Sequence, residues 1–207
     1  MKTVVIFGGS GFVGNHLIRR LAKNGYRIII PYQKQANEAK LRLFGVTGQI
    51  IPIRFKSLNE DKIINILKKT DVLINLKTQW NEKIVSFDKG ILDFNIKLIN
   101  ILKNCERNPL FIFFSGVGIE KDKISRRSLA IYKSETYILK NIQNSVIIKP
   151  SIILGAEDKF LNSLLNIFRF SIIIPLFGRG NNQFQPIYID DVSLGIEKIV
   201  KKSIKGN

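Results

Sequence analysis

The opening of the chain constrains its fold most, because residues 1–25 have the order of a strand, a glycine turn and a helix. Residues 3–7 are β-branched and aromatic, as in a buried parallel strand. Residues 8–14 are a glycine-rich turn, and residues 12–23 carry apolar side chains at the spacing of one helical face. Asn24-Gly25 then ends the helix. An α/β fold is expected to follow from such a start.

The same alternation continues as far as Pro150. Further strands are predicted at residues 26–31, 49–55, 71–76, 109–114 and 145–149. Helices are predicted at residues 59–69, in a long region ending near Cys105, and at residues 126–141. Strands that alternate with helices imply right-handed crossovers. The predicted fold class is therefore α/β, a doubly wound parallel sheet with helices on both faces.

The pattern changes after Pro150. Here the sequence predicts a helix at residues 158–170, an extended segment at 172–175, a loop at 178–182, a strand at 186–189 and a terminal helix at 190–201. Asp190 or Asp191 is expected to cap that last helix. This part is predicted to pack on residues 1–150 as a short, incomplete C-terminal extension within one compact unit.

Composition narrows the class of protein. Thirty-three Lys and Arg against sixteen Asp and Glu leave a net charge of +17, which attracts anionic partners. The chain is also rich in Lys, Ile and Asn throughout, so either a functional surface or compositional drift explains the charge.

No stretch reaches the roughly 18 apolar residues of a membrane span, and the apolar run at residues 4–7 is too short for a signal peptide. Cys105 is the single cysteine. We expect a soluble intracellular protein.

The glycine turn carries the first candidate site. Gly8, Gly11 and Gly14 have the spacing Gly-x-x-Gly-x-x-Gly between a strand and a helix, which is the context that makes such a motif informative. Gly8 would permit the tight turn, Gly11 would let the backbone approach a pyrophosphate, and Gly14 would allow close packing of helix and sheet. The helix amides would then face the phosphates.

The end of the second predicted strand bears on the choice of dinucleotide. NAD sites place an acidic residue here to bind the ribose hydroxyls. The segment at residues 31–34 reads Pro-Tyr-Gln-Lys, and no acid occurs before Glu38. The positive charge of Lys34 therefore predicts NADP(H) in preference to NAD(H).

Several segments together resemble the extended and atypical short-chain dehydrogenase/reductases. They are the glycine turn, the segment around Tyr32 and Ile-Lys-Pro-Ser-Ile-Ile-Leu-Gly at residues 148–155. A narrower resemblance rests on five further segments, residues 29–32, 72–76, 155–162, 174–176 and 185–192. They look like the NADPH-binding accessory subunit, alpha subcomplex subunit 9 type, of respiratory NADH:ubiquinone oxidoreductase and its bacterial relatives.

The resemblance implies a Rossmann domain over residues 1–150 that holds NADP(H) as a structural cofactor. Carried over by position, the cofactor-binding residues are Gly8, Ser10, Gly11, Phe12, Val13, Gly14, Tyr32, Lys34, Leu76, Ser115, Lys133 and Pro150. It also implies docking on the respiratory NADH dehydrogenase near the membrane. The location would be the bacterial cytoplasm, on the cytoplasmic face of the inner membrane, or the mitochondrial matrix in a eukaryote.

The chain departs from the family in three places. Gln33 stands where the family usually has arginine, and Lys56 stands where it often has an acid. The family is also longer at its C-terminus, where the substrate pocket is built, so this pocket is expected to be incomplete, in a shortened relative or a truncated gene product.

The catalytic pair of the family is also expected to be broken. Short-chain reductases place Tyr and Lys four residues apart on one helix face, and the lysine lowers the tyrosine pKa for proton transfer. Lys133 matches the family lysine, but Leu129 stands four residues before it. Ser115 and Lys133 therefore remain as remnant candidates that bind without catalysing.

Three functions compete on this basis. The first is a non-catalytic accessory subunit, and the second is an NAD(P)-dependent oxidoreductase or epimerase-like enzyme. The third, a nucleic-acid-binding module, has only the net charge behind it, and no helix-turn-helix or metal-ligand spacing occurs. We expect the basic segments around residues 19–20, 121–127 and 198–205 to serve docking.

Overall fold

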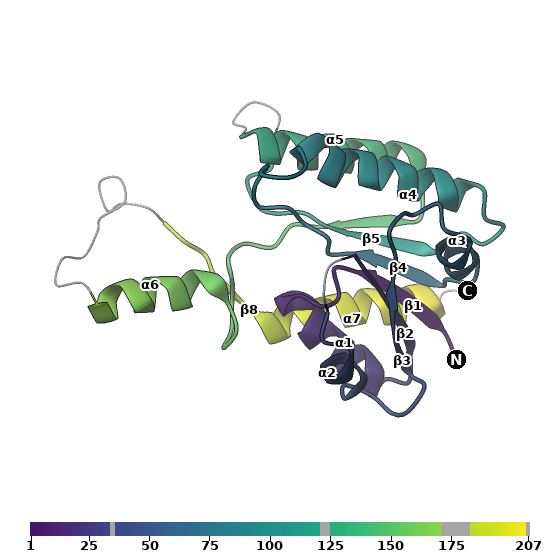
Figure 1. Cartoon of the computed structure of the whole chain (residues 1–207), viewed down its shortest axis with the longest axis horizontal. Helices are drawn as coiled ribbons and strands as arrows, with labels where there is room; N and C mark the ends of the chain where they lie inside the picture. Colours follow the sequence, from purple (N-terminus) through teal and green to yellow (C-terminus); the bar gives the residue numbers. More distant parts are fainter. Residues whose placement is uncertain (34–35, 121–124, 171–182, 206–207) are drawn as a thin grey trace.

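A six-stranded parallel sheet forms the body of the computed structural model (Figure 1). The structure describes all residues except 34–35, 121–124, 171–182 and 206–207. Its elements are β1 (Thr3–Phe7), α1 (Phe12–Lys23), β2 (Arg27–Tyr32), α2 (Glu38–Arg42), β3 (Ile50–Arg54), α3 (Asp61–Lys68), β4 (Val72–Asn75), the π-helical turn η1 (Asp88–Leu92), α4 (Asp93–Lys103), β5 (Leu110–Phe114), α5 (Arg126–Asn141), β6 (Ser145–Ile148), β7 (Ile153–Leu154), α6 (Lys159–Phe170), β8 (Ile187–Tyr188) and α7 (Ile189–Lys205). The strand order is β3-β2-β1-β4-β5-β6, and β7 and β8 pair in parallel as a second, small sheet. The predicted fold class is confirmed.

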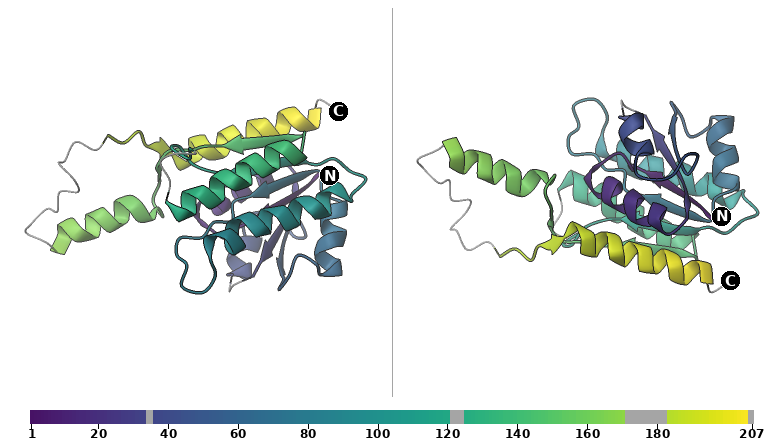
Figure 2. Two further views of the ribbon diagram at one scale, coloured as in Figure 1. Left: turned by 90° about the horizontal axis from the view of Figure 1, so that it is seen from above. Right: turned by 90° about the horizontal axis from the view of Figure 1, so that it is seen from below.

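Helices cover both faces of the large sheet because its strands are apolar on both sides. Along β1, Val4 and Ile6 face one layer, while Val5 and Phe7 face the other. The first layer is built from α1, α2 and α7, and the second from α3, α4 and α5. Figure 2 shows these two layers from above and below.

Three features differ from the sequence predictions. α7 begins at Ile189, so Asp190 and Asp191 lie inside its first turn instead of capping it. The short helix α2 and the short strand β7 are additional elements that the sequence analysis does not predict. The predicted extended segment at residues 172–175 and the loop at 178–182 lie outside the described residues.

The part of the chain after Pro150 divides in two. α7 packs beside α1, and its buried Val192, Ile196 and Val200 join the same core cluster. α6 instead lies away from the sheet (Figures 1 and 2), with apolar side chains exposed along it. Within the described ranges, no helix is both long and apolar enough to cross a membrane. The division at residue 150 stays a prediction.

Candidate functional site

Two glycines of the loop between β1 and α1 are required by the protein's own backbone. Gly8 has φ +76°, and a Cβ there would lie 2.7 Å from the backbone of Leu76 and Lys77. A Cβ on Gly14 would lie 2.2 Å from the carbonyl oxygen of Gly9. These positions bring the loop against the end of β4 and bring α1 against the loop, as expected for the first and third glycines.

Gly11 has a different environment. It is exposed, its φ of −84° suits any residue, and the nearest atom to an added Cβ is the Gly8 carbonyl oxygen at 3.4 Å. Nothing within the fold therefore requires a glycine here. The missing side chain leaves room above the loop, which is what a closely approaching ligand needs.

The amino end of α1 begins directly at this glycine. Gly11 is the N-cap residue and offers no side chain to the first helical amides, and the first turn contains no acidic residue. Ser10 is exposed, while Phe12 and Val13 are half-buried at the helix start. Unpaired amides and the positive end of the helix dipole favour an anion such as a pyrophosphate. The residues present therefore fit a dinucleotide.

A cluster of charged residues surrounds Tyr32 at the end of β2. The Tyr32 hydroxyl donates a hydrogen bond to the Glu38 carboxylate, which also pairs with Arg42 at 3.2 Å. These hydrogen bonds lower the pKa of Glu38, and the bond to Glu38 raises the pKa of Tyr32. Arg54 lies opposite Tyr32 in the register of β2 and β3. Lys34 lies outside the described residues.

This cluster corrects the sequence analysis, which treats the end of β2 as free of acids. Residues 37–42 fold back as α2, where Asn37 accepts a hydrogen bond from the Lys40 amide, and this turn carries Glu38 to Tyr32. The sequence analysis also misses Arg42 and Arg54. The apolar run at residues 50–53 predicts a strand there, but the pairing of this strand with β2, which sets Arg54 opposite Tyr32, comes from the structure.

Ser115 and Pro150 come together at the ends of β5 and β6. The Ser115 amide donates to the Ile148 carbonyl at 2.8 Å, and the Val117 amide donates to the Pro150 carbonyl at 3.0 Å. Leu76 lies at the same edge, since its amide donates to the Phe7 carbonyl at 2.9 Å. The carboxyl ends of these parallel strands are where ligands bind in open α/β sheets.

The partner of the Ser115 hydroxyl is Glu135, not Lys133. Ser115 donates a hydrogen bond to the buried Glu135 carboxylate, which also pairs with Lys149 at 2.7 Å. Lys133 is exposed on α5. Two residues of helix turn the chain by about 200°, so Lys133 and Glu135 lie on nearly opposite sides of α5. The structure therefore does not bring the predicted pair Ser115 and Lys133 together.

The face of α5 that meets the sheet edge instead carries Arg127, Ile131 and Glu135 at intervals of four residues. Ile131 is buried in the core, and Arg127 contacts the segment after β4. The tyrosine and lysine of a reductase would have to occupy this face to act beside Ser115. On this face Arg127 and Ile131 stand four residues apart, whereas Leu129 and Lys133 are both exposed.

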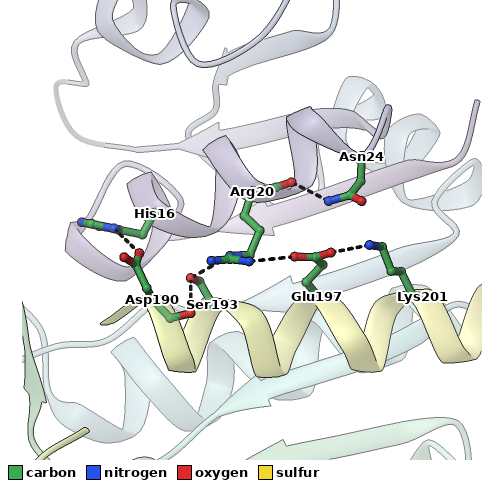
Figure 3. Close-up of polar contacts among 7 residues, drawn as sticks. All are labelled: His16, Arg20, Asn24, Asp190, Ser193, Glu197 and Lys201. Atoms are coloured by element: carbon green, nitrogen blue, oxygen red, sulfur yellow. Dashed lines mark hydrogen bonds and ion pairs between the residues drawn. The ribbon is translucent and has the colours of Figure 1, made fainter. Parts of the chain in front are cut away.

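A row of polar contacts joins α7 to α1, the helix that follows the glycine loop (Figure 3). His16 lies 3.3 Å from Asp190, and the Arg20 guanidinium lies 3.2 Å from the Glu197 carboxylate. Lys201 lies 2.5 Å from the same carboxylate. Burial raises the pKa of Glu197, but the hydrogen bonds from Lys201 and Arg20 outweigh it, so the pKa is lowered from 4.5.

This lowered pKa predicts a pH-dependent contribution to stability. Ionised Glu197 stabilises the fold above pH 4.5, and that contribution is lost as the pH falls through the lower pKa of the folded state. Glu197→Gln should therefore lower the free energy of unfolding by about 1–2 kcal/mol at pH 7, with the difference shrinking below pH 4.5.

Urea unfolding of both proteins across this pH range measures the effect. Glu157→Gln is the control, because Glu157 and Lys40 form a half-exposed pair at 3.8 Å whose loss should change stability by about 0.5 kcal/mol or less. An equal effect of both substitutions, or a difference for Glu197→Gln that grows in acid, would contradict the predicted role of this contact.

The described residues also allow a search for metal ligands. No three His, Cys, Asp or Glu residues among them come together in a group that could hold a metal ion.

The chain is similar in sequence to proteins of known name over most of its length. The chain is 29% identical over 198 residues to NADH dehydrogenase [ubiquinone] 1 alpha subcomplex subunit 9 of Arabidopsis thaliana, covering 95% of this chain and 49% of that protein. It is 30% identical over 203 residues to the subunit of the same name from Rattus norvegicus, covering 95% and 52%. The chain thus spans about half the length of these relatives.

Solved structures share the fold at low identity. Pal from Bacillus thuringiensis superposes with a TM-score of 0.75 at 14% identity, covering 94% of this chain and 72% of that one. Vestitone reductase from alfalfa gives 0.69 at 16% identity, covering 97% and 73%. Residues 4–207 match the NAD dependent epimerase/dehydratase family. The chain therefore belongs to this family, whose description indicates binding of a nicotinamide dinucleotide.

Proposed function

We propose that this chain is an NADP(H)-binding accessory subunit of a respiratory NADH dehydrogenase, in which the dinucleotide has a structural and not a catalytic role. The relatives named above, each an NADH dehydrogenase subunit, support the assignment. The observation that carries the non-catalytic part is the face of α5, where Arg127 and Ile131 stand in place of a tyrosine and a lysine.

The absence of the tyrosine and lysine matters because reduction of a carbonyl needs a proton as well as a hydride. Neither arginine nor isoleucine can supply that proton near neutral pH, since the guanidinium stays protonated and the alkyl group has none to give. Binding of the dinucleotide needs only the loop and the amino end of α1.

The proposed preference for NADP(H) rests on the balance of charge around Tyr32. Glu38 would repel a 2′-phosphate, but Arg42 offsets its charge and Arg54 adds a further positive charge nearby. NADPH should therefore bind about tenfold more tightly than NADH, because each favourable charge pair contributes about 1 kcal/mol in water and more near a protein surface.

Calorimetric titration of both dinucleotides measures this preference. Arg54→Ala should weaken NADPH binding by about tenfold and leave NADH binding unchanged. Arg27→Ala is the control, because Arg27 is exposed at the opposite end of β2. Equal affinities in the unmodified chain, or tighter binding of NADH, would contradict the proposal.

Docking on a larger complex would use the exposed basic surface of α1 and α7, which lie side by side. Arg19 and Lys23 are exposed on α1, and Lys198 and Lys202 are exposed on α7. We place the protein at the cytoplasmic or matrix side of the membrane that carries the dehydrogenase. Nucleic acid should bind only weakly and without sequence preference, with a steep dependence on salt.

Two measurements on protein purified from its own host test this function. At moderate salt the chain should migrate with the membrane NADH dehydrogenase, and a free soluble monomer would contradict the docking. NADPH should not be oxidised when a panel of carbonyl compounds and nucleotide sugars is supplied. Robust turnover that Ser115→Ala or Lys133→Ala abolishes would favour the alternative, an NAD(P)-dependent oxidoreductase or epimerase.

A further inference from the structure

Arg127 reaches from the first turn of α5 to the segment that follows β4. Its Nε donates a hydrogen bond to the carbonyl oxygen of Gln79 at 2.9 Å, and its Nη2 donates to the hydroxyl of Thr78 at 2.9 Å. Its Cζ lies 4.2 Å from the ring centroid of Trp80. These contacts fix the guanidinium at the carboxyl edge of the sheet, the edge where Gly8 and Ser115 also lie.

The charge of this guanidinium has no counter-ion in the part of the chain that the structure describes. Its two hydrogen-bond acceptors are a carbonyl and a hydroxyl, both neutral. The neighbouring Arg126, by contrast, pairs with Glu82 at 3.1 Å. Arg127 is also half-buried, and this burial lowers its pKa. A partly buried cation of this kind is ordinarily paired.

The geometry leaves Arg127 able to bind an anion. A guanidinium has five N–H donors, and the contacts with Gln79 and Thr78 use two of them. The remaining donors form a planar fork that matches the two oxygens of a carboxylate or a phosphate. Stacking on Trp80 holds one face of that fork. The net charge of +17 would draw anions towards the molecule.

We infer that Arg127 anchors an anion-binding subsite at the carboxyl end of β4, and that this subsite takes the carboxylate or phosphate group of a small molecule. The inference rests on the proposed function only in placing that group beside the dinucleotide. The anionic group belongs either to a separate ligand or to the dinucleotide itself. The face of α5 that lacks the tyrosine and lysine of a reductase would then serve recognition.

The fluorescence of Trp80 can report anion binding, because Trp80 is the single tryptophan of the chain and stacks on Arg127. Titration with inorganic phosphate, and separately with acetate, should change Trp80 fluorescence in a saturable way. Sodium chloride at equal ionic strength is the reference and should give no saturable change. Each titration is run with and without saturating NADP⁺, so that loss of the signal with NADP⁺ identifies the dinucleotide as the source of the anion.

Substitutions of Arg127 separate a role in anion binding from a merely structural role of this residue. Arg127→Lys keeps a charge but loses the fork, and should weaken anion binding by about tenfold. Arg127→Gln should abolish the saturable change, while Arg126→Gln, which removes only the pair with Glu82, should leave it intact. Unfolding midpoints of the variants show whether each one folds.

Two results would overturn the inference. One is the absence of a saturable change in the unmodified chain, and the other is a saturable change in Arg127→Gln equal to that of the unmodified chain. A chain that binds phosphate through Arg127 but does not bind NADP⁺ would support the subsite and contradict the proposed function.

Discussion

Gly14→Ala is expected to lower the free energy of unfolding by about 3–5 kcal/mol, because among the glycines that the structure describes an added Cβ would come closest to the backbone here. The added Cβ would lie 2.2 Å from the carbonyl oxygen and 2.5 Å from the carbonyl carbon of Gly9. Both atoms belong to the backbone, so no side chain can rotate away. Relief requires α1 to move off the loop, and that opens the core around Leu17 and Ile18, which are fully buried.

Thermal and urea unfolding measure this loss, with a fall in melting temperature of about 10 °C. Gly195→Ala is the matched control, because Gly195 also lies in a helix, is exposed, and has no atom within 4 Å of an added Cβ. Alanine there should leave stability unchanged or raise it by up to about 1 kcal/mol. A Gly14→Ala protein as stable as the unmodified chain would contradict the close packing of α1 on the loop.

The strands and helices of the main sheet could be predicted because their patterns are local. A buried strand such as β1 is a short apolar run that ends at a glycine turn, and α1 begins after that turn and ends at Asn24-Gly25. The predicted and observed bounds of α5 are the same, residues 126–141. α2 has only five residues and one buried side chain, so it carries no helical periodicity to detect.

The glycine loop of the candidate site could be predicted, because it depends on the backbone alone. The residues of α5 that face Ser115 were harder to predict, because they depend on how this helix is rotated against the sheet. Spacing alone identifies the packing roles of Gly8 and Gly14, and it predicts the role of Gly11. The face of α5 towards Ser115 depends on which residues enter the core, and these include Ala130, Ile131 and Ile138. That apolar stripe is visible in the sequence and predicts that Lys133 lies outside it.

Contacts that depend on how the chain turns or on the order of the strands could not be derived in this way. The hydrogen bond from Tyr32 to Glu38 requires the chain to turn back through α2. The hydrogen bonds from Arg127 to Thr78 and Gln79 join residues nearly 50 positions apart, and they follow from the neighbouring positions of β4 and β5 in the sheet. Strand order, which the sequence pattern leaves undetermined, sets the contacts of Arg127.

Gly11→Asp is expected to weaken binding of both NADPH and NADH by about 100-fold or more, because it places bulk and a negative charge against the pyrophosphate. The same change should not harm the fold. Gly11 is the N-cap of α1 with φ −84° and ψ 179°, a conformation in which aspartate caps a helix as well as or slightly better than glycine. Binding should therefore fall while stability is kept or slightly raised.

Gly11→Asn isolates the two parts of the effect, since asparagine has nearly the shape of aspartate and no charge. It should cap α1 equally well and weaken binding less than aspartate does. The loss that remains in Gly11→Asn measures the bulk, and the additional loss in Gly11→Asp measures the charge.

The most direct test is calorimetric titration of NADPH into the unmodified chain and into Gly11→Asp, with the melting temperature of each recorded without ligand. We predict binding of one NADPH by the unmodified chain and none by Gly11→Asp, with the melting temperature of the variant unchanged or raised. NADPH binding of equal strength in both proteins would contradict a dinucleotide site at the amino end of α1. So would the absence of NADPH and NADH binding in an unmodified chain that is fully folded.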